Sequence, residues 1–187
     1  MKVIEIASGR ETHTFTLPAG GMVPSVEFDA RGKYVVASGP GPGFHAIKIA
    51  TGEVTVIDPG IGWVAEYRFS PDGRFMAAGS MAGIIVWDAR TWKELRRIGD
   101  VVMGSSHSYV AFSRDSKYVA AIDREGHLRF WDPATGADVR SVGEGLRPDG
   151  PVEFTEDGRV VAAGADDTIR VFAPRRVPAP RNTGGGK

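Results

Sequence analysis

The chain contains no cysteine among its 187 residues, which excludes disulfide bonds, zinc sites built on thiolates and a cysteine nucleophile. It also lacks an excess of charge of either sign, because 23 basic and 23 acidic residues give a formal net charge of zero. A balanced chain has no general attraction to nucleic acids or to anionic membranes. We therefore expect neither nucleic acid nor a membrane among its partners.

Long apolar runs are missing as well. No stretch approaches the roughly 20 apolar residues of a membrane-spanning helix, and the opening MKVIEIASGRE has no apolar core of a secretion signal. These absences predict a cytoplasmic protein. No window combines an apolar period of 3.6 residues with helix caps, so no substantial helix is expected. The chain is instead rich in glycine and proline, with 25 and 12 residues, which suits short strands joined by tight turns.

A sequence segment recurs every 41 to 43 residues. Its clearest marker is a phenylalanine that precedes a turn, at Phe28, Phe69, Phe112 and Phe154. A second marker is the last large apolar residue of an alternating run, at Ile6, Ile49, Trp87, Trp131 and Phe172. A period of this length indicates repeated supersecondary units rather than one irregular domain.

Each unit predicts four short antiparallel strands. In the third unit, apolar or alternating runs separated by polar turns cover residues 108–112, 118–122, 127–131 and 137–142. Turn chemistry agrees, because Pro71 and Gly73 in the run SPDGR suit a tight turn. Trp92 stands where other turns between third and fourth strands carry glycine, and we expect it to be partly exposed. Counting all units gives 17 strands.

Three runs resemble the signature of the WD40 repeat family: FSPDGR at 69–74, VWD at 86–88 and WDPATG at 131–136. The resemblance covers about residues 2–172 and implies a β-propeller, in which four-stranded antiparallel blades surround a central channel. Ile49-Ala50 and Phe172-Ala173 replace the Trp-Asp pair in two units. No histidine occupies the family's usual Gly-His position, so propellers with TolB-like repeats stay a second assignment.

The predicted organisation is an all-β propeller region over residues 1–173 with about four repeats. We assign third and fourth strands of a partial blade to 1–22, full units to 23–62, 63–104 and 105–147, first to third strands to 148–173, and a flexible Pro/Arg/Gly-rich tail to 174–187. An open arc of blades would leave sheet edges unpaired. We therefore expect further repeats outside this chain or a homodimer to complete it, and a four-bladed ring closed by a single chain is the third alternative.

The predicted function is that of a non-enzymatic interaction scaffold for a protein or peptide partner. In WD40 relatives, one frequent partner surface is formed by the loops between blades and the loops between second and third strands. Here these loops hold six candidate contact residues: Phe44, Trp63, Met81, His107, Arg124 and Asp166. The alternative is a propeller enzyme or a periplasmic propeller of the TolB or lactonase type, which requires polar catalytic groups converging on the channel.

No catalytic residue, metal ion or cofactor is expected from the sequence. His45 and His127 each open a third strand and look like one repeated position, but no spaced cluster of further ligands accompanies them. Asp72, Asp115 and Asp157 recur because this type of turn favours aspartate, which explains them better than paired catalytic carboxylates do.

Overall fold

The computed structural model describes residues 1–17, 23, 25–38, 43–60, 66–80, 83–98, 109–148 and 150–173. Every regular element in these ranges is a β-strand, and they are numbered β1 to β17. The described residues contain no helix long and apolar enough to cross a membrane. The all-β class and the strand inventory expected from the repeat are therefore confirmed.

Three sheets are complete, each with four antiparallel strands in chain order. The first contains β3 (Val26–Phe28), β4 (Tyr34–Ser38), β5 (Phe44–Lys48) and β6 (Val54–Ile57). The second contains β7 (Arg68–Phe69), β8 (Phe75–Ser80), β9 (Gly83–Asp88) and β10 (Glu94–Ile98). The third contains β11 (Ala111–Phe112), β12 (Val119–Ile122), β13 (Leu128–Trp131) and β14 (Asp138–Val142).

The sheets at the two ends are smaller. A two-stranded hairpin, β1 (Lys2–Ile4) and β2 (Glu11–Thr14), precedes the complete sheets. A three-stranded sheet follows them, made of β15 (Val152–Phe154), β16 (Val160–Ala163) and β17 (Ile169–Phe172). One sheet thus falls in each expected unit, while the exact unit boundaries stay predictions, and the tail at 174–187 lies outside the described residues.

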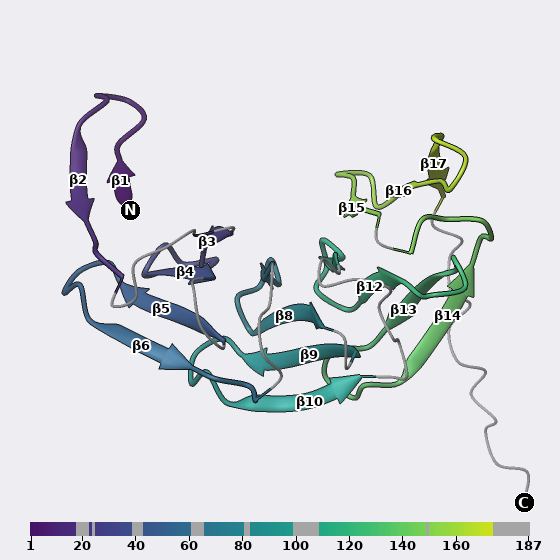
Figure 1. Ribbon diagram of the computed structural model, residues 1–187, viewed down its shortest axis with the longest axis horizontal. Helices are drawn as coiled ribbons and strands as arrows, with labels where there is room; N and C mark the ends of the chain where they lie inside the picture. The colour runs from purple at the N-terminus through teal and green to yellow at the C-terminus, as the bar shows by residue number, and fades with distance from the viewer. Residues whose placement is uncertain are drawn as a thin grey trace, which may run out of the picture.

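The sheets are arranged as blades along an open arc (Figure 1). The fourth strands β6, β10 and β14 run along its outer, convex side, and the first strands β3, β7, β11 and β15 follow one another on the inner side. The hairpin β1–β2 stands at one end, and β15–β17 stand at the other. The two ends rise on the same side of the arc without meeting.

Turns between first and second strands share one hydrogen-bonding pattern. The Ser70 hydroxyl donates to the Asp72 carboxylate at 2.7 Å and accepts the Phe75 N–H at 2.9 Å. The same hydroxyl-to-carboxylate bond recurs in two later sheets, at Ser113–Asp115 and Thr155–Asp157. These aspartates therefore close turns, as the sequence predicts, because their side chains mimic the backbone bonds of the turn.

Neighbouring blades are joined mainly by their apolar faces. Trp87 packs with Phe44 of the preceding sheet, at 5.5 Å between ring centroids. Trp131 packs in the same way against Val86 and its neighbours. Their exposed fractions are only 1% and 2%. Both tryptophans are therefore buried between blades.

The second repeat marker needs correction in the partial unit at residues 1–22 and in the first complete unit. The equivalent third-strand position can be found from the strand pairing. In each complete sheet, the marker phenylalanine on the first strand pairs with a residue on the second strand, and this residue in turn pairs with one residue on the third strand. That residue is Trp87 in β9 and Trp131 in β13, but it is Ile47 in β5 rather than Ile49. Ile6 lies beyond β1 and is fully exposed. Residues two apart share a face of the run, so alternation alone places the marker too far along.

Trp92 occupies the turn between β9 and β10 with φ of 59°, in the left-handed region where the equivalent turns use Gly9, Gly52 and Gly136. It is half-buried, as expected. Its ring meets Tyr34 of the preceding sheet edge-on at 5.3 Å. A bulky residue is tolerated in this unfavourable conformation because its ring packs against the apolar contact between the first and second complete sheets.

We expect the replacement of Trp87 or Trp131 by alanine to lower the free energy of unfolding by about 3–5 kcal/mol, because each leaves a cavity between two sheets. Denaturant unfolding followed by circular dichroism measures this. Leu95→Ala serves as a control, because Leu95 lies on the outer strand β10 with 43% of its surface exposed. A loss for either tryptophan as small as that of the control would contradict the assigned register.

We also expect acid to weaken the protein through the turn carboxylates. Partial burial, the largest single influence, would raise the pKa of Asp72, but hydrogen bonds from Arg74 and Ser70 together lower it. With a lowered folded-state pKa, the stabilisation is complete above the unfolded value near 3.8 and is lost as the pH falls through the folded value. Urea unfolding from about pH 5 to about pH 2 should show this loss.

The same experiment on Asp72→Asn should show a shallower fall of stability with acid, because this variant has no carboxylate to protonate. Glu53→Gln is the control, since Glu53 is an exposed carboxylate in a different kind of turn. An acid dependence that is the same in the protein and in Asp72→Asn would show that the turn carboxylate does not contribute.

Candidate functional site

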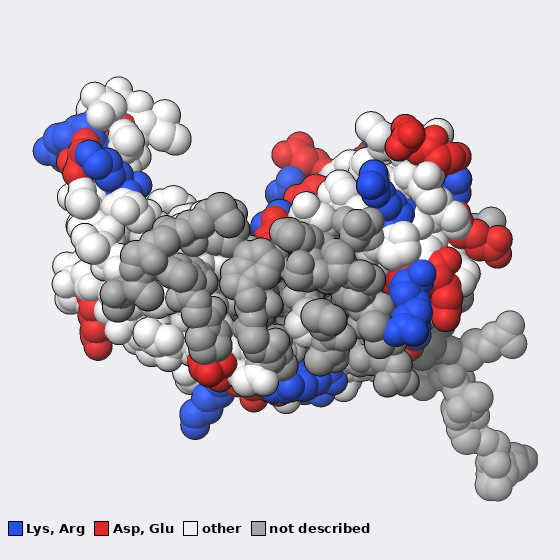
Figure 2. All heavy atoms as spheres, in the orientation of Figure 1, with Lys and Arg blue, Asp and Glu red and all other residues white. Residues whose placement is uncertain are grey.

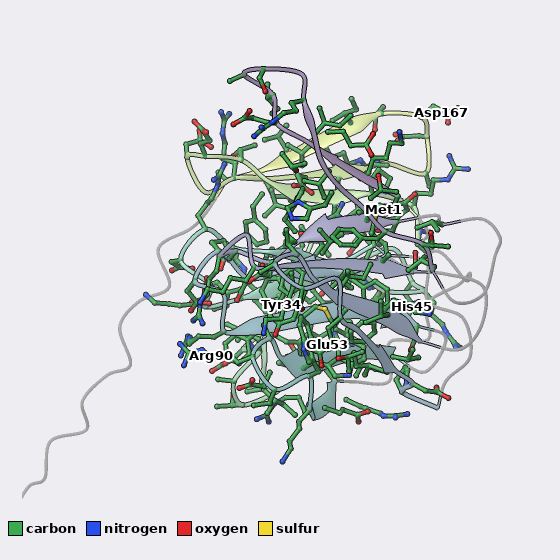
Figure 3. All side chains as sticks on the ribbon, turned by 90° about the vertical axis from the view of Figure 1, so that its left-hand side faces the viewer. Met1, Tyr34, His45, Glu53, Arg90 and Asp167 are labelled. Atoms are coloured by element: carbon green, nitrogen blue, oxygen red, sulfur yellow. The ribbon has the colours of Figure 1, made fainter. Side chains whose placement is uncertain are left out.

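The connections between strands form two opposite rims. Arg90, in the β9–β10 turn, and Asp167, in the β16–β17 turn, lie on opposite sides of the molecule in Figure 3. We call the side of Asp167 the loop rim and define it by residues 123–127, 143–147 and 164–168. These segments are the β12–β13 turn, the β14–β15 connection and the β16–β17 turn.

The β12–β13 turn is shaped by a buried aspartate. The Asp123 carboxylate accepts the N–H groups of Glu125 at 3.1 Å and His127 at 2.9 Å. Gly126 follows with φ of 81°, and its carbonyl accepts the N–H of Leu146 at 3.0 Å. The turn is therefore anchored to the β14–β15 connection, and Arg124 at its tip is exposed.

The β16–β17 turn is fixed in a similar way. The Thr168 hydroxyl donates to Asp166 at 2.6 Å, and the Arg170 guanidinium lies 3.2 Å from the same carboxylate. The N–H of Ala165 donates to the Gly145 carbonyl at 3.0 Å. The 143–147 connection thus binds both turns, and three separate parts of the chain form one continuous surface.

The six candidate contact residues differ in where the structure places them. Arg124 and Asp166 are exposed on the loop rim. Phe44 is wrong as a contact residue, because it begins β5 and is fully buried against Tyr67 and Trp87. The remaining candidates lie outside the described residues and stay predictions: Trp63, Met81 and His107. The structure therefore brings together two of the six.

The loop rim carries charges of both signs. Alongside Arg124 and Asp166, the exposed charged residues are Glu125, Glu144, Arg147 and Asp167. The rim faces the viewer in Figure 2, where acidic and basic side chains lie close together at the C-terminal end of the arc. Such a mixed surface favours a partner with its own pattern of acidic and basic groups over a uniformly charged polymer.

One cluster on this rim was not expected from the sequence. Asp123, Glu125 and His127 bring two carboxylates and an imidazole within 4.8 Å of one another. Asp123 already accepts two backbone N–H groups, so its structural role accounts for its position. The assumed equivalence of His45 and His127 is wrong, because His45 lies two residues before Ile47 and His127 lies four before Trp131.

A second cluster joins the inner strands. The Glu27 carboxylate on β3 lies 3.3 Å from the Arg68 guanidinium on β7 and accepts the N–H of Phe69. Arg68 also pairs with Glu66. Burial raises the pKa of Glu27, and Arg68 only partly opposes this. The sequence held a signal, since Glu27 and Arg68 each precede a marker phenylalanine and therefore occupy the same position in consecutive blades.

Comparisons with known proteins agree with this architecture. No family model matches the chain. The chain is 28% identical over 158 residues to the WD repeat-containing protein SL1-17 of Schistosoma mansoni, across 82% of this chain and 51% of that protein. It thus spans about half the length of this curated relative. The similarity supports repeats of the WD40 type.

A solved structure shows the same fold. The computationally designed Ika4 protein matches with a TM-score of 0.69 and 20% sequence identity, over 86% of this chain and 97% of that chain. At this identity the likeness concerns the fold alone. Together with the four-stranded antiparallel sheets of the described residues, it identifies the architecture as that of β-propeller blades.

The anchoring of the loop rim predicts the effect of Gly126→Ala. A Cβ at Gly126 would lie 2.6 Å from the Leu146 carbonyl oxygen, and φ is 81°. We expect a loss of unfolding free energy of about 2–3 kcal/mol, since both a clash and a strained conformation result. Gly9→Ala is the control, because its φ of 68° is similar but no atom lies within 4 Å. Equal losses in denaturant unfolding would contradict the close contact.

Proposed function

We propose that the chain is a non-enzymatic scaffold that binds a protein or peptide partner through its loop rim. The observation that carries this proposal is the hydrogen bonding of the 143–147 connection to the turns on either side, at Gly126 and Ala165. Exposed charges are therefore held in a fixed arrangement on a base of packed sheets. Loops fixed on a rigid scaffold are where binding residues concentrate.

The chemistry of the turn carboxylates also supports a scaffold. Asp88 accepts the N–H groups of Arg90 and Thr91 at 2.9 and 2.8 Å. These bonds, that of Thr91 first, lower the pKa of Asp88, so it stays ionised at neutral pH. An ionised carboxylate committed to backbone donors maintains a turn and is poorly suited to exchange protons with a substrate.

The experiment compares two double variants that reverse charges on opposite rims. Arg124→Glu with Glu144→Lys alters the loop rim and leaves the hydrogen bonds of Asp166 in place, and Arg90→Glu with Glu156→Lys alters the other rim. All four residues are exposed, so the fold should be little affected. Proteins crosslinked to the intact chain in cells would be identified by mass spectrometry, and the affinity of each purified candidate for the chain would then be measured.

We expect the loop-rim variant to lose about tenfold or more in affinity for its partner, as expected when paired charges become repulsive. The control should bind as the intact chain does. A partner that binds both variants equally well would contradict the assignment of the loop rim. Turnover of a substrate by the purified chain would contradict the non-enzymatic role.

A further inference from the structure

The last sheet presents an uncovered apolar face. Ile169 and Val171 of β17 are 77% and 54% exposed. The strand pairing places them where Ile84 and Val86 lie in β9, and both of those residues are fully buried under the next blade. The end of the arc therefore carries the same surface that joins two blades elsewhere, without the blade that covers it.

The first complete sheet has the complementary defect. Phe28 of β3 is 52% exposed, and Val26 on the same strand is also exposed. The equivalent Phe69 and Phe112 are buried against the preceding blade. Phe28 is uncovered because the β1–β2 hairpin packs onto this sheet around Ala37, Ile47 and Val54, and Phe28 is not part of that cluster.

In the part of the chain that the structure describes, the last sheet has three strands and no fourth strand pairs with β17. Beside this edge of β17 lies a groove of about 680 Å³ between this sheet and the preceding one. Its apolar lining includes Phe130, Val139, Val142, Phe154 and Phe172. In the three complete sheets, the corresponding place next to the third strand is filled by β6, β10 or β14. The groove thus has the position and the lining of a strand-binding site.

The N-terminal hairpin carries the strand that this groove lacks. Its turn contains Gly9 with φ of 68°, like Gly52 in the β5–β6 turn, so β1 and β2 correspond to third and fourth strands. Met1, Val3 and Phe15 pack the hairpin onto the first complete sheet, as one blade packs on the next. Each end of the arc therefore has what the other end lacks.

We propose that a second copy of this chain completes both ends, forming a closed ring with two-fold symmetry. In each of two identical contacts, β15–β17 of one copy packs against β3 of the other and receives β2 in its groove. Each end of the arc in Figure 1 is complementary to the other end. Two copies related by one two-fold axis therefore bring both pairs of ends together at once, which favours a second copy as the partner. This proposal concerns the ends of the arc and does not depend on the loop rim.

The blade that closes the ring combines β15–β17 of one copy with the β1–β2 hairpin of the other. These are five strands for four places, because β1 and β17 both correspond to third strands. We assign the third place to β17, since Phe172 packs against the preceding sheet. Ile4 of β1, in contrast, is largely exposed. β1 is therefore displaced when β2 enters the groove as the fourth strand. Pairing then removes the exposed edge of β17, which would otherwise recruit other strands.

The mass of the chain in solution tests the proposal. Light scattering and sedimentation over a range of concentrations should give twice the 20.0 kDa of one chain. Ile169→Asp with Val171→Asp at one end, or Phe28→Asp at the other, should raise the dissociation constant of the dimer about tenfold or more. These residues are exposed in the single chain, so circular dichroism should show that the variants remain folded.

Mixing separates this ring from other assemblies. The β17 variant and the Phe28→Asp variant should form a mixed dimer more readily than either forms its own, since only the mixture retains one intact contact. Leu95→Asp is the matched control, because Leu95 is exposed on an outer strand away from both ends, and it should leave the dimer unchanged.

Three results would overturn the proposal. The first is the mass of a single chain at every concentration, as expected if further blades of a longer polypeptide complete the arc. The second is growth into open polymers, which would show that the contacts do not close. The third is a dimer that the end variants weaken no more than the Leu95→Asp control does.

Discussion

The packing of one sheet against the next is the constraint on which the whole structure depends. Consecutive residues of β8 show why: Met76 belongs to the core shared with the preceding blade, and Ala77 to the core shared with the following one. Since strand residues alternate between faces, each sheet is apolar on both sides. No blade can bury its own surface, and the protein is stable only as a series of neighbours.

The two rims of the protein have different roles. On the side of the short turns, the same hydroxyl and carboxylate groups recur from blade to blade, and Asp72 donates its N–H to Ser116 of the next blade at 3.1 Å. That rim is uniform because it maintains the repeat. The loop rim carries exposed charges of both signs, and its hydrogen bonds hold the turns that bear them. Charges fixed on a rigid base are what a specific binding surface requires.

The sequence predicts the fold well, because the features that define a blade are local. A turn, an alternating run and a marker phenylalanine lie within a few residues of one another, so their order gives the strands directly. The register of the first unit is less accessible, since Ile47 and Ile49 are both apolar and share a face. Ile47 precedes Gly52 of the following turn by the same interval as Trp131 precedes Gly136. Counting back from the turn glycine therefore identifies Ile47, whereas counting forward along the apolar run does not.

Candidate contact residues are harder to predict, because a loop and a buried strand end look alike in sequence. Phe44 follows a glycine- and proline-rich run, yet it begins a strand and is buried. Arg124 and Asp166 are polar residues at turn tips, where the solvent position follows from the turn itself. The hydrogen bonds that join their turns to residues 143–147 link separate connections and leave no local pattern.

The contacts between blades also determine how the number of blades is set. The face around Ile169 and Val171 does not differ in kind from the face around Ile84 and Val86. The described face of β17 would therefore accept one more blade, as the equivalent face of β9 does. The blade number is a property of curvature: the small rotation from each sheet to the next, summed along the chain, fixes where an arc meets its own beginning. Substitutions that alter this rotation, even within a fully buried contact, would change the size of the ring without changing its surface chemistry.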